Sequence, residues 1–377
     1  MKTAPRYALI GALNLALALT FYLISPVEPK LSDRDAYDYV GQAPFTSNCP
    51  FSIYCYRVLV PTVVHRLPLD PDIGWRAYQV LSNAAAGSVI AVVAATLSSA
   101  ASVPLLASVM VQASYGFAFT AYDPYAADPL VFLIAALLTW CWITNRPWPA
   151  LGLSAIGIFA KETVALVAVA LALAAVIDRR PGWKKWLVPA LVGGTLLAAF
   201  HIVSRLWLNW EIASNPAAQL SHGSWIGLWW RNNPFLERKA YMIFATFGFA
   251  WLFAGLGWRR APLPWRALAI GTIPPMLLLL VAQTPERALG NAFYVVVPLA
   301  VLFASRAPAV AVAAIALNAL VTAKAGSSSV WLPSARWTLI PAAIAAVFLV
   351  VRTVRTRTHL SKIRSGCCSS RRDPSAT

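Results

Sequence analysis

Three carboxylates lie close together in residues 33–38, which read Asp-Arg-Asp-Ala-Tyr-Asp. Asp33 and Asp35 stand two positions apart, a spacing at which two carboxylates can share a divalent cation, or one can act as a general base while the other orients it. The simpler alternative is an acidic loop exposed to water. We take Asp33 and Asp35 as candidate catalytic residues and, if a metal ion (Mg²⁺ or Mn²⁺) is required, as its candidate ligands.

A second pair of charges, Lys161-Glu162, follows the apolar run Pro149–Ala160. That run is only about 18 Å long as a helix, against roughly 30 Å of hydrocarbon in a bilayer. The pair is therefore expected to be recessed, where each charge costs about 2.5–3.5 kcal/mol unless it faces water or a partner. Neighbouring residues diverge around a helix, so at least one must contact another segment. The alternative is a loop that lies closer to water.

Other charged residues are placed in a similar way. Glu286-Arg287 lies between two short apolar runs, and Arg57 lies in an aromatic segment. Asp128 precedes Pro129 at the start of an apolar run, where helix capping alone would explain it. We predict that these residues converge with Asp33 and Asp35 in one polar pocket on the outer side of the membrane. The candidate substrate-binding residues are Arg57, Asp128, Lys161, Glu162, Glu286 and Arg287.

The composition indicates the kind of protein that positions these charges. Of the 377 residues 59% are hydrophobic and 12% are charged, and the mean hydropathy is +0.63. An average soluble domain has about 25% charged residues, so a soluble protein is excluded, and so is a disordered one. The net charge of +17 would suit nucleic acid, but its distribution along the chain has a membrane explanation.

Apolar runs predict an all-α bundle of about twelve transmembrane helices. A helix needs about 20 apolar residues to cross a bilayer, with cases from about 17 to 25. The runs are Ala8–Ile24, Ala77–Leu97, Ala101–Ala121, Pro129–Thr144, Pro149–Ala160, Val164–Ile177, Leu187–Leu208, Tyr241–Trp258, Ala267–Ala282, Ala292–Ser305, Ala307–Ala323 and Trp337–Val351.

The basic residues predict the orientation, because Lys and Arg concentrate in cytoplasmic loops. With both ends inside, more than half of the 31 basic residues face the cytoplasm. We therefore expect a single transmembrane domain, 1–351, with long outer loops at 25–76 and 209–240, and a basic cytoplasmic tail, 352–377. Within the first loop, Phe51–Leu69 is predicted to lie in the interface as an amphipathic helix kinked at Pro61.

Cysteine, histidine and glycine add little. Cys49 and Cys55 share the first outer loop, and whether they form a disulfide stays open. The four histidines lack metal-ligand spacing. No Gly-rich phosphate loop is present, so we do not expect a cytosolic nucleotide substrate. We expect no nucleic-acid partner, because the distribution of the basic residues has a membrane explanation.

Several of these segments resemble the GT-C glycosyltransferase superfamily of bacterial polytopic membrane proteins. The likeness rests on the acidic first outer loop followed by Pro50-Phe-Ser-Ile-Tyr-Cys-Tyr-Arg57, on Ala127-Asp128-Pro129, on Lys161-Glu162-Thr163, and on Glu286-Arg287 before a span containing Pro298. It covers about Leu9 to Ser305. The large soluble C-terminal domain of many members is missing, which leaves the acceptor and any metal open.

The resemblance implies an enzyme of the bacterial inner membrane whose site faces the periplasm or exterior. It implies transfer of a hexose or pentose from a polyprenyl-phosphate donor, with Asp33 and Asp35 as base or metal ligands. Arg57, Lys161 and Arg287 would hold the lipid phosphate, since guanidinium binds phosphate through two hydrogen bonds.

Two other functions remain open from the sequence. A secondary transporter or lipid flippase would use Lys161-Glu162 for coupling, although no repeats of the usual transporter kind occur. A non-catalytic membrane subunit is also compatible with the sequence. For a glycosyltransferase, the expected partners are a lipid-linked sugar donor and membrane lipids. The oligomeric state is left open.

Overall fold

The computed structural model describes residues 4–24, 31–210, 243–244, 246–282 and 285–315. Within these ranges the chain forms fifteen helices and no strand, so the prediction of an all-α protein is confirmed. They all belong to one of two compact units, and the second unit, Pro333–Thr377, lies outside the described residues. The predicted basic tail, 352–377, lies outside them too, as does nearly all of the predicted outer loop 209–240.

The helices occur in a simple order along the chain. They are α1 (Ala4–Ile24), α2 (Leu31–Gln42), the 3₁₀ helix η1 (Ser52–Tyr56), α3 (Leu59–Arg66), α4 (Pro71–Ala95), α5 (Ser102–Gln112), α6 (Tyr115–Tyr122), α7 (Asp128–Ile143), α8 (Pro147–Gly157), α9 (Thr163–Ile177), α10 (Lys184–Leu208), α14 (Phe249–Trp258), α15 (Leu263–Ala282), α16 (Pro285–Gly290) and α17 (Phe293–Ala304).

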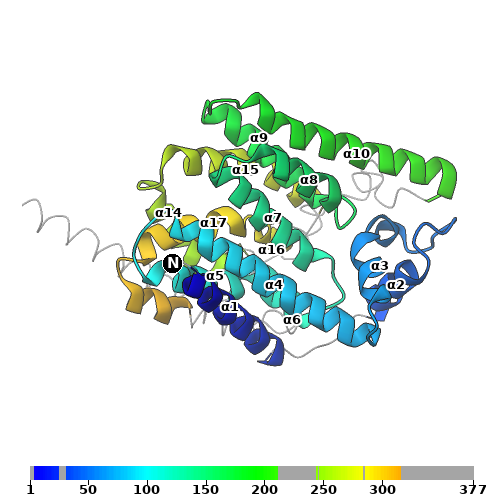
Figure 1. Ribbon diagram of the computed structural model, residues 1–377, viewed down its shortest axis with the longest axis horizontal. Helices are drawn as coiled ribbons and strands as arrows, with labels where there is room; N and C mark the ends of the chain where they lie inside the picture. The colour runs from blue at the N-terminus through cyan, green and yellow to red at the C-terminus, as the bar shows by residue number, and fades with distance from the viewer. Residues whose placement is uncertain (1–3, 25–30, 211–242, 245, 283–284, 316–377) are drawn as a thin grey trace, which may run out of the picture. The chain divides into compact units, whose positions relative to one another are not determined.

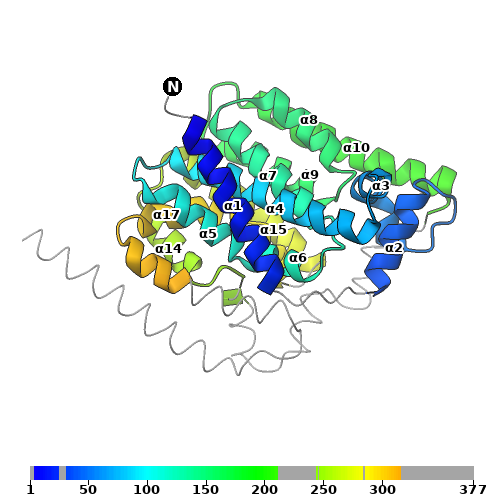
Figure 2. The ribbon, with the colours of Figure 1, turned by 60° about the horizontal axis from the view of Figure 1, so that its bottom comes forward.

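Helix α4 is central to the first half of the bundle. Its start is fixed by Asp70, whose side chain accepts hydrogen bonds from the backbone N–H groups of Asp72 and Ile73, and by Pro71 in the first turn. From there α4 packs against α1, α5 and α7, as Figures 1 and 2 show. Helices α8, α9, α10 and α15 form a neighbouring layer, in which α9 packs against both α10 and α15.

Buried polar side chains join the helices around α4. The Asn14 side chain donates to Ser108 Oγ at 2.8 Å, and the Gln112 side chain donates to the backbone oxygen of Asn83 at 2.9 Å. A Cβ atom at Gly87 would collide with the Asn14 and Gln112 amides, so a larger residue there would force these hydrogen-bonded side chains to move. In an apolar surrounding, such interhelical hydrogen bonds help to select the packing partner.

The number of predicted membrane spans is wrong. Among the described residues, four helices are long and apolar enough to cross a membrane: Arg6–Leu23 within α1, α4, α10, and Leu263–Leu280 within α15. A fifth is obtained if α5 and α6, which meet at a bend of 52°, count as one span. The chain is therefore a possible multi-pass membrane protein with four or five candidate spans in this part.

The physical reason for the difference is the length of the helices. The apolar runs at Pro129–Thr144, Pro149–Ala160, Val164–Ile177, Tyr241–Trp258 and Ala292–Ser305 correspond to helices of 16, 11, 15, 10 and 12 residues. At 1.5 Å per residue, each is shorter than about 30 Å. Of the remaining runs, Ala307–Ala323 lies partly and Trp337–Val351 wholly outside the described residues.

The predicted first outer loop forms a small helical unit of its own, which we call the cap segment (residues 31–66: α2, η1 and α3). Helix α2 packs mainly on α3 and η1, and Figures 1 and 2 show α2 and α3 together beside the start of α4. A Cys49–Cys55 disulfide closes the turn before η1. Backbone hydrogen bonds from Asn48 to Leu208 (2.8 Å) and from Leu59 to Phe159 (3.0 Å) attach this unit to the bundle.

Candidate functional site

The cap segment places Asp33 beside two tyrosines. Asp33 lies in the first turn of α2, and its Oδ1 accepts a hydrogen bond of 2.5 Å from the hydroxyl of Tyr54 in η1. The ring of Tyr37, one helical turn after Asp33, meets the Tyr54 ring edge-on at 5.1 Å. Burial, followed by the hydrogen bond to Asp33, raises the pKa of Tyr54. Its hydroxyl therefore remains a donor to the Asp33 carboxylate at neutral pH.

Arg57 follows η1 and is buried. Its Nη2 atom lies 3.3 Å from Glu162 Oε1, and its guanidinium also makes a hydrogen bond with the Tyr37 hydroxyl. Burial is the largest single influence and lowers the pKa of Arg57, but Glu162, Tyr37 and Asp128 together outweigh burial, so the pKa of Arg57 is raised above its ordinary value. The Arg57 Nε atom is also buried, and among the described residues it has no hydrogen-bond partner. One donor of a permanently charged group is thus left for a ligand.

Lys161 and Asp128 form a second ion pair. The Lys161 side chain is only 1% exposed, and its Nζ atom lies 2.6 Å from Asp128 Oδ1. Asp128 is in the first turn of α7, before Pro129, while Lys161 lies in the break between α8 and α9. The two short helices exist because the chain turns at this break, where Gly157 leaves room for the side chain of Val164.

The two ion pairs and Asp33 belong to one site. The charges of Arg57, Asp128 and Asp33 all influence the pKa of the Tyr37 hydroxyl, so the three side chains lie near it. Burial raises the pKa of its hydroxyl, and the positive charge of Arg57 offsets part of that rise. A shared apolar core lies under the site, in which Tyr37 packs with Trp75, Tyr125 and the alanines that precede Asp128 and Lys161. We call Asp33, Tyr37, Tyr54, Arg57, Asp128, Lys161 and Glu162 the outer cluster.

The structure brings together five of the residues singled out in the sequence: Asp33, Arg57, Asp128, Lys161 and Glu162. Asp35 is not among them, because its side chain is exposed on α2. Glu286 and Arg287 belong to α16, but their side chains lie outside what the structure describes. Sequence reasoning missed Tyr37 and Tyr54. The available signal was the position of Tyr37 four residues after Asp33, on the same face of a helix.

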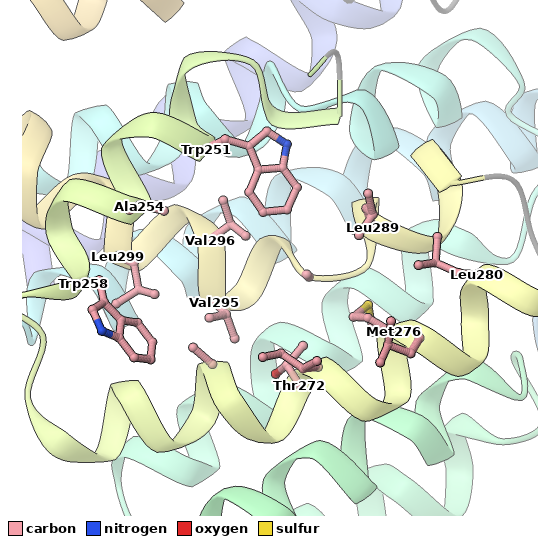
Figure 3. A pocket seen from close by; sticks show the side chains of 15 residues that line it. Trp251, Ala254, Trp258, Thr272, Met276, Leu280, Leu289, Val295, Val296 and Leu299 are labelled. Carbon is pink, nitrogen blue, oxygen red and sulfur yellow. The ribbon is translucent and has the colours of Figure 1, made fainter. Parts of the chain in front are cut away.

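A cavity of about 460 Å³ lies between α14, α15 and α17. Its walls are almost entirely apolar, and Figure 3 shows Trp258 and Leu299 at one end and Leu280 and Leu289 at the other. Ile273 and Leu277 on α15 line this cavity and are also more than half exposed. The cavity is thus reached from the outer surface of α15, which would face lipid in a membrane.

Helix α15, which lines the cavity, also packs against α9, the helix that follows the Lys161 break. Helices α9 and α15 pack together, with Gly271 against Ala170 and Ala174. Helix α9 begins just after the Lys161 break, and α15 begins near the carboxyl end of α17, where the Arg260 guanidinium lies 5.8 Å from the centre of the Phe303 ring. Leu280 and Thr163 each lie nine or so residues, about 14 Å, along their helices from the contact of Gly271 with Ala170 and Ala174.

Neither metal-ligand groups nor comparison with known proteins adds to the description of the site. Among the described residues, no group of three His, Cys, Asp or Glu side chains is arranged to hold a metal ion. Comparison with protein-family models, with curated proteins and with solved structures finds no match to this chain.

Proposed function

We propose that the protein is a GT-C-like membrane glycosyltransferase that moves a sugar from a polyprenyl-phosphate donor to an acceptor hydroxyl outside the cytoplasm. The observation that carries this proposal is the outer cluster, in which the Asp33 carboxylate lies close to a buried arginine with an uncommitted Nε donor. A carboxylate can accept the acceptor's proton, and a guanidinium can bind the donor's phosphate. One site would thus contain both groups that the reaction needs.

The proposed reaction balances with these groups alone. The acceptor oxygen bonds to the anomeric carbon of the sugar while the bond from that carbon to the phosphate oxygen breaks. The hydroxyl proton passes to Asp33, which Tyr54 holds in place. Polyprenyl phosphate leaves with its additional negative charge next to Arg57, and Lys161 adds positive charge to the same region. Preorganised charge of this kind is usually the largest contribution to catalysis.

The apolar cavity supports a donor that carries a lipid chain. An isoprenoid chain can enter from the exposed face of α15, and α15 packs against α9, the helix that follows Lys161 and Glu162. A volume of about 460 Å³ lies in the usual range of ligand cavities. The Cys49–Cys55 disulfide supports an outward-facing cap segment, because disulfides persist in oxidising compartments.

Filling the cavity is expected to weaken the use of long-chain donors. Ala269 lines the cavity, and Ala269→Phe would take the space of about two methylene groups of the chain, each worth about 0.8 kcal/mol. We expect KM for a C55 polyprenyl-phosphate sugar to rise about tenfold, with little change for a water-soluble C10 analogue. The measurement is release of polyprenyl phosphate in membrane vesicles, with a panel of hexose and pentose donors.

Ile270→Phe is the matched control for this variant, because Ile270 is the next residue and is exposed. Equal loss with C10 and C55 donors in Ala269→Phe would contradict the role of the cavity. Absence of donor turnover by the wild-type protein with every sugar in the panel would contradict the proposed function itself.

The buried Lys161–Asp128 pair also fits a second function, transport. Charge pairs inside transmembrane bundles often couple substrate movement to ion or proton movement. In proteoliposomes, a transporter would accumulate a lipid-linked or free sugar without breaking the bond to phosphate. Uptake that disappears in Asp128→Asn, which removes the charge that pairs with Lys161, would favour transport over transfer if no polyprenyl phosphate is released.

A further inference from the structure

A second charged group lies next to the outer cluster and has no role in the proposed reaction. Arg34 Nη2 lies 2.8 Å from Asp72 Oδ1, and Arg34 Nε lies 3.8 Å from Asp38 Oδ2. The hydroxyl of Tyr125 donates a hydrogen bond to the same Asp72 oxygen, and the Arg34 guanidinium lies 5.8 Å from the centre of the Tyr125 ring. Asp72 is therefore bound from two sides.

The three partners come from three separate elements. Arg34 follows Asp33 in the first turn of α2, Asp72 lies in the first turn of α4, and Tyr125 lies three residues before Asp128 in the segment between α6 and α7. One side of this contact thus continues into the helix turn that carries Asp33. The other side continues into the segment that leads to Asp128 and its partner Lys161.

The first turn of α2 has few other attachments to the bundle. Tyr37 anchors the middle of the helix through Trp75, at 5.2 Å between ring centres. The Tyr54–Asp33 hydrogen bond lies within the cap segment, so it links Asp33 to α4 and α7 only indirectly, through the packing of Tyr54 against the core that contains Trp75 and Ala127. Terminal helix turns fray readily when no tertiary contact holds them. Arg34 supplies such a contact directly beside Asp33.

We propose that Arg34 and Asp72 are positioning residues that hold Asp33 at a fixed place relative to Asp128 and Lys161. This inference rests on the proposed function for its catalytic consequence, but the structural link can be tested without it. The Arg34 and Asp72 side chains are about one third exposed, at 37% and 33%, and exposed ion pairs add little to overall stability. Their contribution is to geometry, where a displacement of about 1 Å can lower a rate about 100-fold.

A double-mutant cycle with hydrogen exchange tests the link. The measurement is hydrogen exchange of the backbone amides of residues 35–38 in purified protein in nanodiscs. These amides bond to carbonyl groups of the first turn of α2. We expect Arg34→Gln and Asp72→Asn each to speed their exchange about tenfold, and the double variant to be no faster than either single variant. Asp38→Asn is the control and should leave exchange near the wild-type rate. Unchanged exchange in Arg34→Gln, or additive effects in the double variant, would overturn the proposal.

Turnover gives the second readout. Arg34→Gln should lower kcat for donor cleavage by about 10- to 100-fold with an unchanged KM and an unchanged melting temperature, and Arg34→Lys should restore part of the rate. A rise in KM alone would contradict a positioning role. If the wild-type protein cleaves no donor, the proposed function fails while the exchange cycle still decides whether Arg34 and Asp72 hold α2.

Discussion

Replacing Asp33 by Asn is expected to lower sugar transfer by at least about 100-fold, because general-base catalysis contributes about 10²- to 10⁴-fold. The amide keeps the size of the carboxylate and can still accept the Tyr54 hydrogen bond, but it cannot take up the proton of the acceptor. The protein should insert and melt as the wild type does. The measurement is transfer from a radiolabelled polyprenyl-phosphate sugar in membrane vesicles, with protein amount and melting temperature determined in parallel.

Asp35→Asn is the matched control, since it makes the same chemical change two residues away. Asp35 is exposed on α2 and lies apart from the outer cluster, so this variant should retain nearly full activity. Full activity of Asp33→Asn would remove Asp33 from the reaction. Equal loss in both variants would instead indicate a shared effect of the acidic segment, such as the metal ion that the sequence left open.

Lys161→Met is expected to be the most destabilising single change in the site. It leaves the Asp128 carboxylate, which lies 2.6 Å from Lys161 Nζ, without its buried countercharge. Breaking a buried ion pair from one side costs about 3–5 kcal/mol. The measurement is the melting temperature of detergent-solubilised protein, followed by size-exclusion chromatography after heating.

The double variant Asp128→Leu/Lys161→Met separates the lost pair from a general packing defect. Replacing both charges by apolar side chains is often neutral or stabilising, so the double variant should recover most of the lost stability. Lys185→Met is the surface control and should melt as the wild type does, because Lys185 is exposed. A double variant that melts below Lys161→Met would contradict this account of the pair.

Local sequence features predicted part of the site correctly. The short apolar run before Lys161-Glu162 indicated a break, and the structure has α8 end at Gly157 and α9 begin at Thr163. The neighbouring charges Lys161 and Glu162 also have different partners, as expected, because Lys161 pairs with Asp128 and Glu162 with Arg57. These are consequences of helix geometry and of the cost of buried charge, so one sequence is enough to derive them.

The remaining features depend on contacts between distant segments. Several apolar runs form helices of only 10 to 16 residues, which are too short to count as full spans, so the number of spans was overestimated. The partner of Asp33 is 21 positions away at Tyr54, and the Arg34–Asp72 contact requires knowing that α2 lies beside the start of α4. The cavity is formed by helices whose apolar residues look no different from those of any packed helix.

The most direct test of the central claim is equilibrium binding of radiolabelled polyprenyl phosphate to the purified protein in nanodiscs. We expect saturable binding by the wild type, nearly unchanged binding by Asp33→Asn, and binding weakened about tenfold or more by Arg57→Gln, since a hydrogen bond to a charged group is worth about 1.5–3 kcal/mol. Arg66→Gln, at an exposed arginine of the cap segment, should bind as the wild type does. Equal binding by wild type and Arg57→Gln, or no saturable binding by the wild type, would contradict a lipid-phosphate site at the outer cluster.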